Sequence, residues 1–346
     1  MATQENTVIE MDAIRDKKAG RAGSRWINIC ILGMLLIFPL LITDDYFLHV
    51  GITIFLFIVY TATYRLILRT GQLHFGANAF IGVGAYVSAI LARDLGISFW
   101  LGIFVAGIIA GALAIGIGRF ALGVKGVYFA IITWGFAESL RFLYIRVEGV
   151  FGGPSGFFGI PGPDPLPFFK QIDFSKEIHY YYLALALLLL TLWILYRMEK
   201  ARFGLILAGI READSLASSV GVNIMKYKVA TFAICSGLAG MGGSFYAHYT
   251  HFISPNDFTI LLTIQLAMYA VVGGVNKFSG ATVGTVVLSV AGEFFAGYGF
   301  YRMLLFSGLT IVVLLIFPGG LVELPKETQG VWLRLLQKYR RSATAT

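Results

Sequence analysis

The sequence has little charge and little cysteine. Only 13% of its 346 residues are charged and 57% are hydrophobic, whereas about a quarter of the residues of a soluble globular domain are charged. A soluble protein of this composition would expose more apolar surface than water tolerates. Its two cysteines, Cys30 and Cys235, both lie in apolar runs, so the sequence indicates neither a disulfide framework nor a cysteine-based metal site.

The sequence also lacks the motifs of common nucleotide, catalytic and metal sites. It has no Gly-x-x-x-x-Gly-Lys-[Ser/Thr] phosphate loop, no Gly-x-Ser-x-Gly nucleophile elbow and no His-Glu-x-x-His zinc helix. Its five histidines form no metal-ligand set, and its apolar runs carry no regular series of acids that would indicate a proton relay. We therefore predict no catalytic residues, no metal and no cofactor. Any uphill transport would draw its energy from another subunit.

Long, continuous apolar runs are what the sequence does contain. Several approach or exceed the roughly 20 residues that a helix needs to cross a bilayer. The 41 glycines fit this interpretation, because small residues let membrane helices approach closely. The sequence thus predicts an all-α, polytopic membrane protein. Its ten expected spans are residues 27–41, 48–64, 77–91, 99–121, 126–143, 180–195, 229–246, 258–275, 281–296 and 303–317.

The distribution of basic residues predicts the orientation of these spans. With the N-terminus in the cytoplasm, the inside segments carry 21 of the 27 Lys and Arg residues, as the positive-inside rule requires. An odd number of spans would put the basic N-terminal segment and the basic C-terminal tail on opposite sides, so we expect both termini in the cytoplasm. Topology also explains the net charge of +8, which therefore indicates no nucleic-acid partner. The outside segments hold only Arg93, Arg141, Arg146, Lys170, Lys176 and Arg302.

We expect a transmembrane permease domain over residues 27–321, between a cytoplasmic N-terminal segment, 1–26, and a basic cytoplasmic tail, 322–346. Two long loops interrupt it. The external loop, 146–179, is rich in Gly and Pro, which predicts a compact, turn-rich cap. The cytoplasmic loop, 199–228, is polar and basic and is long enough for one or two short helices.

A polar interruption at residues 71–80 is the first candidate for function. It reads Gly-Gln-Leu-His-Phe-Gly-Ala-Asn-Ala-Phe and enters the third predicted span from the inner side. Its glycines permit non-helical backbone, and broken backbone at membrane depth is tolerated only beside protein or water. The alternative is a polar turn at the inner membrane face. With two polar residues of the eighth span, the predicted substrate pathway comprises Gln72, His74, Asn78, Thr263 and Gln265.

The cytoplasmic loop contains an amphipathic pattern. Apolar residues recur at steps of three and four, which predicts a helix near residues 211–220 that ends at Gly221. Its polar face carries Arg211, Asp214 and three serines. One use of such a helix is docking against a cytoplasmic partner, and the alternative is a helix that lies on the membrane surface.

Ionisable residues also occur inside predicted spans. Glu138 and Arg141 are three residues apart, so they can pair on one helix face, and Glu293 lies in the ninth span. Intramembrane charges are candidates for function. All three residues lie toward the outer ends of their spans, however, where long side chains reach the interface. We therefore predict that Glu138 and Arg141 form an ion pair that is structural or lines the pathway.

Four blocks follow one another along the chain: Gly71-Gln-Leu with Gly82-Val-Gly-Ala-Tyr86, then Gly123-Val-Lys-Gly-Val-Tyr-Phe-Ala-Ile-Ile-Thr133 with Glu138 and Arg141, then Arg202-Phe-Gly with Ile210-Arg-Glu, and last Phe252-Ile-Ser-Pro with Val272-Gly-Gly-Val275. In this order they resemble the membrane subunit of ABC importers of the branched-chain amino acid permease family, over about residues 45–325.

The resemblance implies an all-helical permease in the inner (cytoplasmic) membrane of a bacterium or archaeon. It implies as partners a second permease subunit (a paralogue or a second copy), two cytoplasmic ATP-binding subunits, an external solute-binding protein and the lipid bilayer. The solute stays open, because relatives also carry urea and amides, and because His74, Phe75 and Ala77 replace the family's usual Ser, Leu and His. The resemblance further implies an ATPase-coupling helix that contains Ile210, Arg211, Glu212, Asp214, Ala217 and Gly221.

We therefore expect a permease subunit that moves small polar solutes, branched-chain or other amino acids first, with energy from separate ATPase subunits. The alternative is a stand-alone channel or ion-coupled carrier for urea, amides or amino acids, which would transport without any ATPase. A membrane-embedded transferase is a third possibility, and it would need catalytic residues that converge at one interface.

Overall fold

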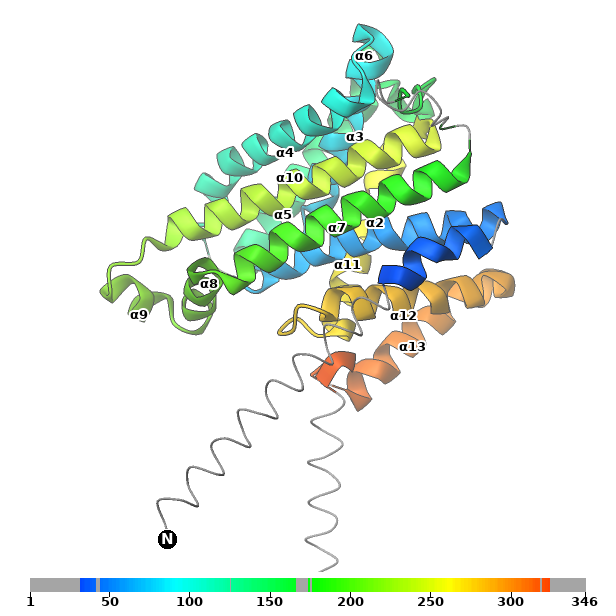
Figure 1. Cartoon of the computed structure of the whole chain (residues 1–346). Coiled ribbons are helices and arrows are strands. Elements are labelled where there is room, and N and C mark those ends of the chain that lie inside the picture. The colour runs from blue at the N-terminus through cyan, green and yellow to red at the C-terminus, as the bar shows by residue number, and fades with distance from the viewer. Residues whose placement is uncertain are drawn as a thin grey trace, which may run out of the picture.

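The computed structural model describes residues 32–41, 44–124, 126–165, 174, 176–317 and 319–323. This part of the chain is a bundle of helices (Figure 1), so the all-α prediction is confirmed. The principal helices are Leu32–Leu41, α2 (Asp45–Leu68), α3 (Ala77–Leu95), α4 (Phe99–Ala121), α5 (Val127–Arg146), α7 (Glu177–Lys200), α8 (Arg202–Glu212), α9 (Asp214–Ser219), α10 (Ile224–Thr250), α11 (Ile260–Gly273), α12 (Gly280–Phe294) and α13 (Arg302–Ile316).

The lengths of these helices bear on how many of them cross a membrane. Some coincide with predicted spans but are short, such as the 14-residue α11. The count of ten spans and the cytoplasmic position of both termini therefore stay predictions. The predicted N-terminal segment 1–26 and residues 324–346 of the predicted tail lie outside the described residues. Within the part of the chain that the structure describes, the stretches that are long and apolar enough to span are Asp45–Leu68, Phe99–Ala121, Glu177–Lys200, Ile224–Thr250 and Gly280–Tyr301.

Helix α2 is central to the bundle. It packs against α7, α10, α11 and α12, and most of its side chains from Ile52 to Ile67 are buried. Apolar side chains of α2 lie on all of its faces, as expected of a helix that its neighbours enclose. Asp44 caps its start, because the Asp44 carboxylate accepts a hydrogen bond from the backbone N–H of Tyr46 at 3.0 Å.

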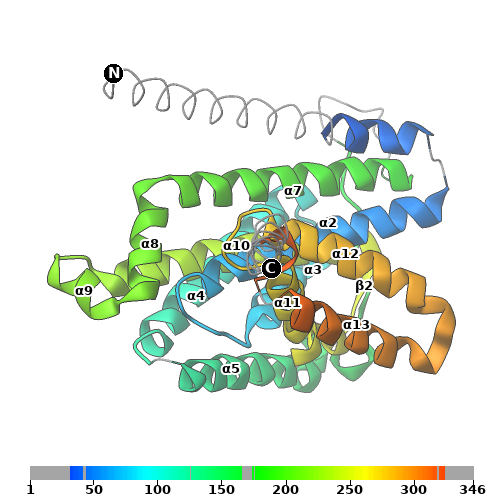
Figure 2. The same cartoon turned by 90° about the horizontal axis from the view of Figure 1, so that it is seen from below.

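Two groups of helices pack against α2. In the first, α10 packs against α3 and α4. Its approach to α3 is close, because a Cβ on Gly84 would overlap the backbone of Gly240, and one on Gly243 would overlap the carbonyl oxygen of Ile81. Small residues are the usual means by which membrane helices pack this closely. In the second group, α11, α12 and α13 contact one another, as Figure 2 shows from below.

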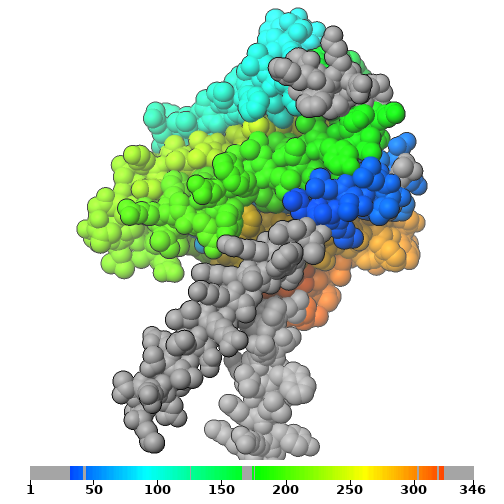
Figure 3. Space-filling model, viewed as in Figure 1, coloured from blue at the N-terminus to red at the C-terminus, as the bar shows by residue number. Residues whose placement is uncertain are grey.

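The two long loops lie at opposite ends of the bundle (Figure 1). One end, which we call the cap end, carries α6 (Glu148–Phe151), the 3-10 turn η1 (Gly153–Ser155) and strand β1 (Phe157–Phe158). The other end carries α8 and α9, and Figure 3 shows this part, in yellow-green, projecting at the edge of the molecule. The two loops can therefore contact different partners.

The described part of the external loop is held on the bundle by hydrogen bonds. Strand β1 pairs antiparallel with β2 (Phe252–Ile253), which follows α10. His248 Nδ1 lies 2.6 Å from the Pro161 carbonyl oxygen, and its Nε2 lies 2.8 Å from Ser88 Oγ. Because a carbonyl oxygen can only accept, Nδ1 carries the proton and Nε2 accepts from Ser88. Residues 166–173 and 175 of this loop lie outside the described residues.

The cytoplasmic loop departs from the predicted single helix over residues 211–220. The backbone is extended at Ala213, with φ −156° and ψ 96°, so that α8 ends at Glu212 and α9 begins at Asp214. An acidic residue favours a helix start, because its charge opposes the partial positive charge there. Gly221, with φ +83°, ends α9: its N–H donates to Ser218, and the N–H that follows donates to Ala217.

Candidate functional site

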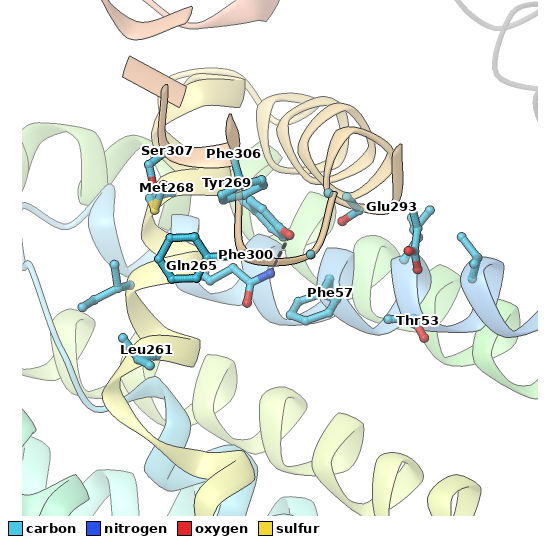
Figure 4. Close-up of a pocket in the computed structure, with 16 residues that line it drawn as sticks. Thr53, Phe57, Leu261, Gln265, Met268, Tyr269, Glu293, Phe300, Phe306 and Ser307 are labelled. Atoms are coloured by element: carbon cyan, nitrogen blue, oxygen red, sulfur yellow. Dashed lines mark hydrogen bonds between the residues drawn. The ribbon is translucent and has the colours of Figure 1, made fainter. Parts of the chain in front are cut away.

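Two cavities lie against the N-terminal half of α2. The first, of about 520 Å³, lies among α2, α11, α12, the 3-10 segment η3 (Phe295–Tyr301) and α13 (Figure 4). The second, of about 460 Å³, lies among α2, α3, α10, the turn η2 (Pro255–Phe258) and α11. The residues that line both cavities are Thr53, Phe57, Leu261 and Gln265.

The first cavity is mostly apolar and has a few polar groups. Figure 4 shows Phe57, Phe300 and Phe306 reaching it from three different elements. Gln265 Nε2 donates a hydrogen bond to the Tyr269 hydroxyl oxygen at 2.6 Å, and the carboxylate of Glu293 also lines the cavity. An apolar lining with a few placed polar groups is typical of sites for small molecules.

The second cavity contains a carboxylate, Asp257, at the N-terminal side of α11. Burial raises the pKa of this carboxyl group, because the charged form loses solvation. His49 Nδ1 lies 2.6 Å from the Tyr249 hydroxyl oxygen, and that hydroxyl donates to Glu177 Oε2 at 2.9 Å. Two helices that line the cavity, α2 and α10, are thus connected to the start of α7.

Among the predicted pathway residues, Gln265 lines both cavities, whereas Asn78 and Thr263 bond to each other. Thr263 Oγ1 donates to Asn78 Oδ1 at 2.9 Å and accepts from the Asn78 backbone N–H at 3.1 Å. Asn78 Nδ2 donates to the Phe258 carbonyl oxygen at 2.7 Å. Both side chains are buried. This pair therefore joins the start of α3 to α11 beside the second cavity.

The other two predicted pathway residues, Gln72 and His74, lie in the non-helical segment between α2 and α3. Both are buried, and neither the Gln72 Oε1 atom nor the two ring nitrogens of His74 have a hydrogen-bond partner among the described residues. The His74 ring packs against Tyr64 and Phe232. Gln72 lines a small cavity of about 240 Å³ that it shares with Arg211 and other residues of the α8–α9 loop.

Glu138 and Arg141 form the ion pair that their spacing predicted. Arg141 Nε lies 2.8 Å from Glu138 Oε1, and the two side chains are partly exposed on α5. Neither residue lines the two large cavities. A partly exposed pair of this kind contributes little to stability in water, and a role in the pathway stays a prediction.

The predicted coupling residues lie at the end of α8, in α9 and in the turn that follows α9. Ile210 is buried against the bundle, while Arg211 Nη1 donates to Asn276 Oδ1 at 2.8 Å, in the segment between α11 and α12. Asp214 pairs with Lys228 of α10 at 3.3 Å. Glu212 is exposed and Ala217 is partly buried. Gly221 forms the turn that ends α9. Through the two polar contacts, the α8–α9 loop connects to α10 and to the α11–α12 segment.

The sequence did not reveal a buried charge cluster beside this loop. Glu199, at the end of α7, accepts hydrogen bonds from Arg65 and Arg69 of α2, the latter at 2.7 Å. The Arg65 guanidinium is buried and also donates to the backbone carbonyls of Val275 and Lys277 at 2.9 and 3.0 Å. The i, i+4 spacing of the two arginines on a buried helix was the available signal, but it did not indicate the partner 134 residues away.

Comparison with known proteins shows which protein family the chain resembles. The chain matches the model of the permease component of branched-chain amino acid transport systems over residues 46–317. It is 28% identical over 276 residues to the high-affinity branched-chain amino acid transport system permease protein LivM of Escherichia coli K12, covering 74% of this chain and 65% of that protein. The LivM protein of Salmonella typhimurium matches to the same extent.

A relative from an archaeon is similar over more of its length. The probable branched-chain amino acid transport permease protein LivH of Methanocaldococcus jannaschii is 25% identical over 304 residues, 81% of this chain and 91% of that protein. The chain spans less than two thirds of the length of the two LivM proteins. No solved structure shows a significant match.

The family match extends from α2 to α13 and so includes both cavities and the α8–α9 loop. These relatives bear the names of transport permease proteins rather than of enzymes. The resemblance inferred from the four sequence blocks is thereby confirmed. The chain belongs to the family of permease components of branched-chain amino acid transport systems.

Proposed function

We propose that this chain is the permease subunit of an ATP-driven importer that moves small polar solutes, amino acids first, across the inner membrane. The observation that carries the proposal is the connection between the α8–α9 loop and the helices that line the cavities. The names of the relatives support amino acids as the solute. The family implies separate ATPase subunits as the energy source.

Two polar contacts would transmit a movement of the α8–α9 loop to the rest of the bundle. Arg211 connects α8 to the segment between α11 and α12 through Asn276, and Asp214 connects α9 to α10 through Lys228. Helices α11 and α12 line the first cavity, and α10 and α11 line the second. A displacement of α8 and α9 by a closing ATPase pair would therefore move walls of both cavities.

The surface of the α8–α9 loop is suited to such a partner. Leu205, Leu216 and Val220 expose 74%, 69% and 78% of their surface. They lie at the end of the bundle that the positive-inside rule puts in the cytoplasm. Exposed apolar side chains rimmed by charged ones are typical of protein contact sites. We assign this surface to an ATP-binding subunit, the opposite cap end to an external solute-binding protein, and a lateral face to a second permease subunit.

The proposal is tested by leucine uptake into proteoliposomes that contain the permease, its ATPase subunits and the binding protein. The test variant exchanges two charges of α8, Arg211→Glu with Glu212→Arg, which keeps the net charge but breaks the contact with Asn276. The control is Lys226→Glu, a change at an exposed residue in the first turn of α10. We expect uptake to collapse in the double variant and to persist in the control.

Two results would contradict the proposal. One is leucine uptake by the permease alone at the rate of the full complex, which would indicate a channel or carrier. The other is unchanged uptake in the double variant, which would exclude the α8–α9 contacts from energy transfer. Insertion of each variant into the liposomes is verified by its amount in the membrane fraction.

A further inference from the structure

An open groove on α4 shares no residue with the two cavities beside α2. It has a volume of about 520 Å³, and α4 and one residue of α5 line it. The lining residues are Ile109, Ala112, Leu113, Gly116, Ile117, Phe120 and Phe136. All of these side chains are apolar, so a polar ligand group in the groove would lose hydrogen bonds to water without replacing them. The groove therefore favours a hydrocarbon occupant.

The groove follows a single face of α4. Its α4 residues recur at alternating steps of three and one along the chain, which is the spacing of one side of a helix. Ile109 exposes 37% of its surface and Phe120 exposes 86%. Because α4 is long and apolar enough to cross a membrane, this exposed face would lie in the hydrocarbon core of the bilayer. An occupant of the groove therefore comes from within the membrane.

The dimensions of the groove fit one lipid chain. Ile109 and Phe120 are about three helical turns apart, which corresponds to about 16 Å along α4. One leaflet contributes about half of the roughly 30 Å hydrocarbon core. Spread over that length, the volume corresponds to a channel about 6 Å across, whereas a helix with its side chains is roughly 10 Å across. The groove thus fits an extended acyl chain of one leaflet better than a helix of a second subunit.

A cation lies at one end of the groove. Arg119 directly precedes Phe120 and follows Gly116 by three residues, so it is a neighbour of the groove on the helix surface. Arg119 is exposed, and no Asp or Glu of the described residues lies within ion-pair distance of it. An exposed arginine without an acidic partner at the membrane surface attracts an anionic headgroup.

This end of the groove belongs to the inner leaflet. Past Arg119, the chain at Gly123 lies beside the start of α10, because Met225 Cε is 3.8 Å from the position of a Cβ on Gly123. The start of α10 follows α9, at the end of the bundle that the positive-inside rule puts in the cytoplasm. The cytoplasmic leaflet is also the one that carries anionic lipids.

We propose that this groove binds an anionic glycerophospholipid of the inner leaflet, with one acyl chain along α4 from Phe120 to Ile109 and the headgroup phosphate at Arg119. A headgroup with a net negative charge fits better than a zwitterionic one, because the ammonium group of the latter finds no carboxylate beside Arg119. The site is separate from both cavities and does not depend on the proposed function.

Two glycines provide a matched pair of variants. Gly116 lines the groove, and a Cβ at this position would meet nothing within 4 Å. A leucine there would extend into the groove without displacing another residue. Gly135 of α5 has the same free space but does not line the groove. Gly116→Leu therefore fills the groove, and Gly135→Leu is its control.

The test is photolabelling of the full chain in phosphatidylcholine nanodiscs that contain a phosphatidylglycerol probe with a diazirine at the end of one acyl chain. Labelled peptides are identified by mass spectrometry, and unlabelled phosphatidylglycerol or phosphatidylethanolamine is added as the competitor. We expect saturable labelling near Ile109, where the end of the acyl chain would lie. Phosphatidylglycerol should displace the probe, and phosphatidylethanolamine should not.

The variants separate the chain contact from the headgroup contact. We expect Gly116→Leu to lower the saturable labelling about fivefold or more, because its side chain takes the place of the acyl chain, and Gly135→Leu to label as the wild type does. Arg119→Gln should reduce the preference for phosphatidylglycerol over phosphatidylethanolamine about fivefold, as expected for one basic residue at the membrane surface. Arg119→Lys should retain that preference.

Four results would overturn the inference. They are labelling that no competitor saturates, equal displacement by the two competitors, unchanged labelling in Gly116→Leu, and labelling that disappears when a second copy of the chain shares the nanodisc. The last result would assign the groove to a protein contact. The amount of each variant in the nanodisc fraction is measured, and should Gly116→Leu fail to accumulate, the competition series and Arg119→Gln decide the inference.

Discussion

Replacing Glu199 by Gln would leave two guanidinium groups of α2 without their carboxylate. Arg65 and Glu199 expose only 1% and 8% of their side chains, whereas Arg69 exposes 23%. The three residues join the ends of α2 and α7, and Arg65 also donates to the backbone between α11 and α12. The variant therefore removes a carboxylate that links α2 to α7.

The cost follows from the burial. Removing one member of a buried ion pair costs about 3–5 kcal/mol, because the remaining charge is left unpaired away from water. We expect about 3 kcal/mol for Glu199→Gln, since the glutamine carbonyl keeps part of the hydrogen bonding. Arg69→Gln removes the more exposed partner and leaves the pair with Arg65 intact, so we expect about 1 kcal/mol or less.

The assay is equilibrium unfolding in mixed detergent micelles, followed by tryptophan fluorescence. A double-mutant cycle with Arg65→Met isolates the pair, and we expect a coupling energy of about 2 kcal/mol between Arg65 and Glu199. The reasoning is refuted if Glu199→Gln costs no more than Arg69→Gln, or if the effects of Arg65→Met and Glu199→Gln simply add.

Two further variants test the packing by the same unfolding assay. Gly84→Ala should cost about 1–3 kcal/mol or prevent accumulation of the protein, because the new Cβ would overlap the backbone of Gly240; Gly116→Ala, which meets nothing within 4 Å, should be neutral or slightly stabilising. Thr263→Val should cost about 2 kcal/mol by leaving Asn78 without two hydrogen bonds, while Thr263→Ser should not. Equal stability of the Gly84→Ala and Gly116→Ala variants would contradict the close packing of α3 on α10. Equal stability of Thr263→Val and Thr263→Ser would contradict the role of the Asn78–Thr263 hydrogen bonds.

The sequence predicted the helices better than the contacts between them. The predicted span 99–121 coincides with α4, because an uninterrupted apolar run has ends that hydropathy marks clearly. Helix α7 extends beyond the predicted 180–195 at both ends, from Glu177 to Lys200, because a helix can continue past the apolar run into polar surroundings. The break at Ala213 was missed, since the apolar spacing continues across it.

The contacts within the candidate sites were likewise not predictable from the sequence. The polar character of Asn78 and Thr263 was visible, but their mutual hydrogen bonds join residues 185 positions apart, which no local pattern reveals. Glu199 was counted only as the start of a loop, although burial makes it the centre of a charge cluster. Asp257 was not singled out, because a single acid in a turn is typical of a helix cap, and its place in the lining of the second cavity depends on the fold.

The most direct test of the central claim is ATP-dependent uptake of radiolabelled leucine by the wild-type chain, reconstituted with a second permease subunit, the binding protein and either active or omitted ATPase subunits. We expect leucine to accumulate against its gradient only when the ATPase subunits and ATP are both present. Equal uptake without them would contradict the proposed function and identify the chain as a channel or carrier that acts alone.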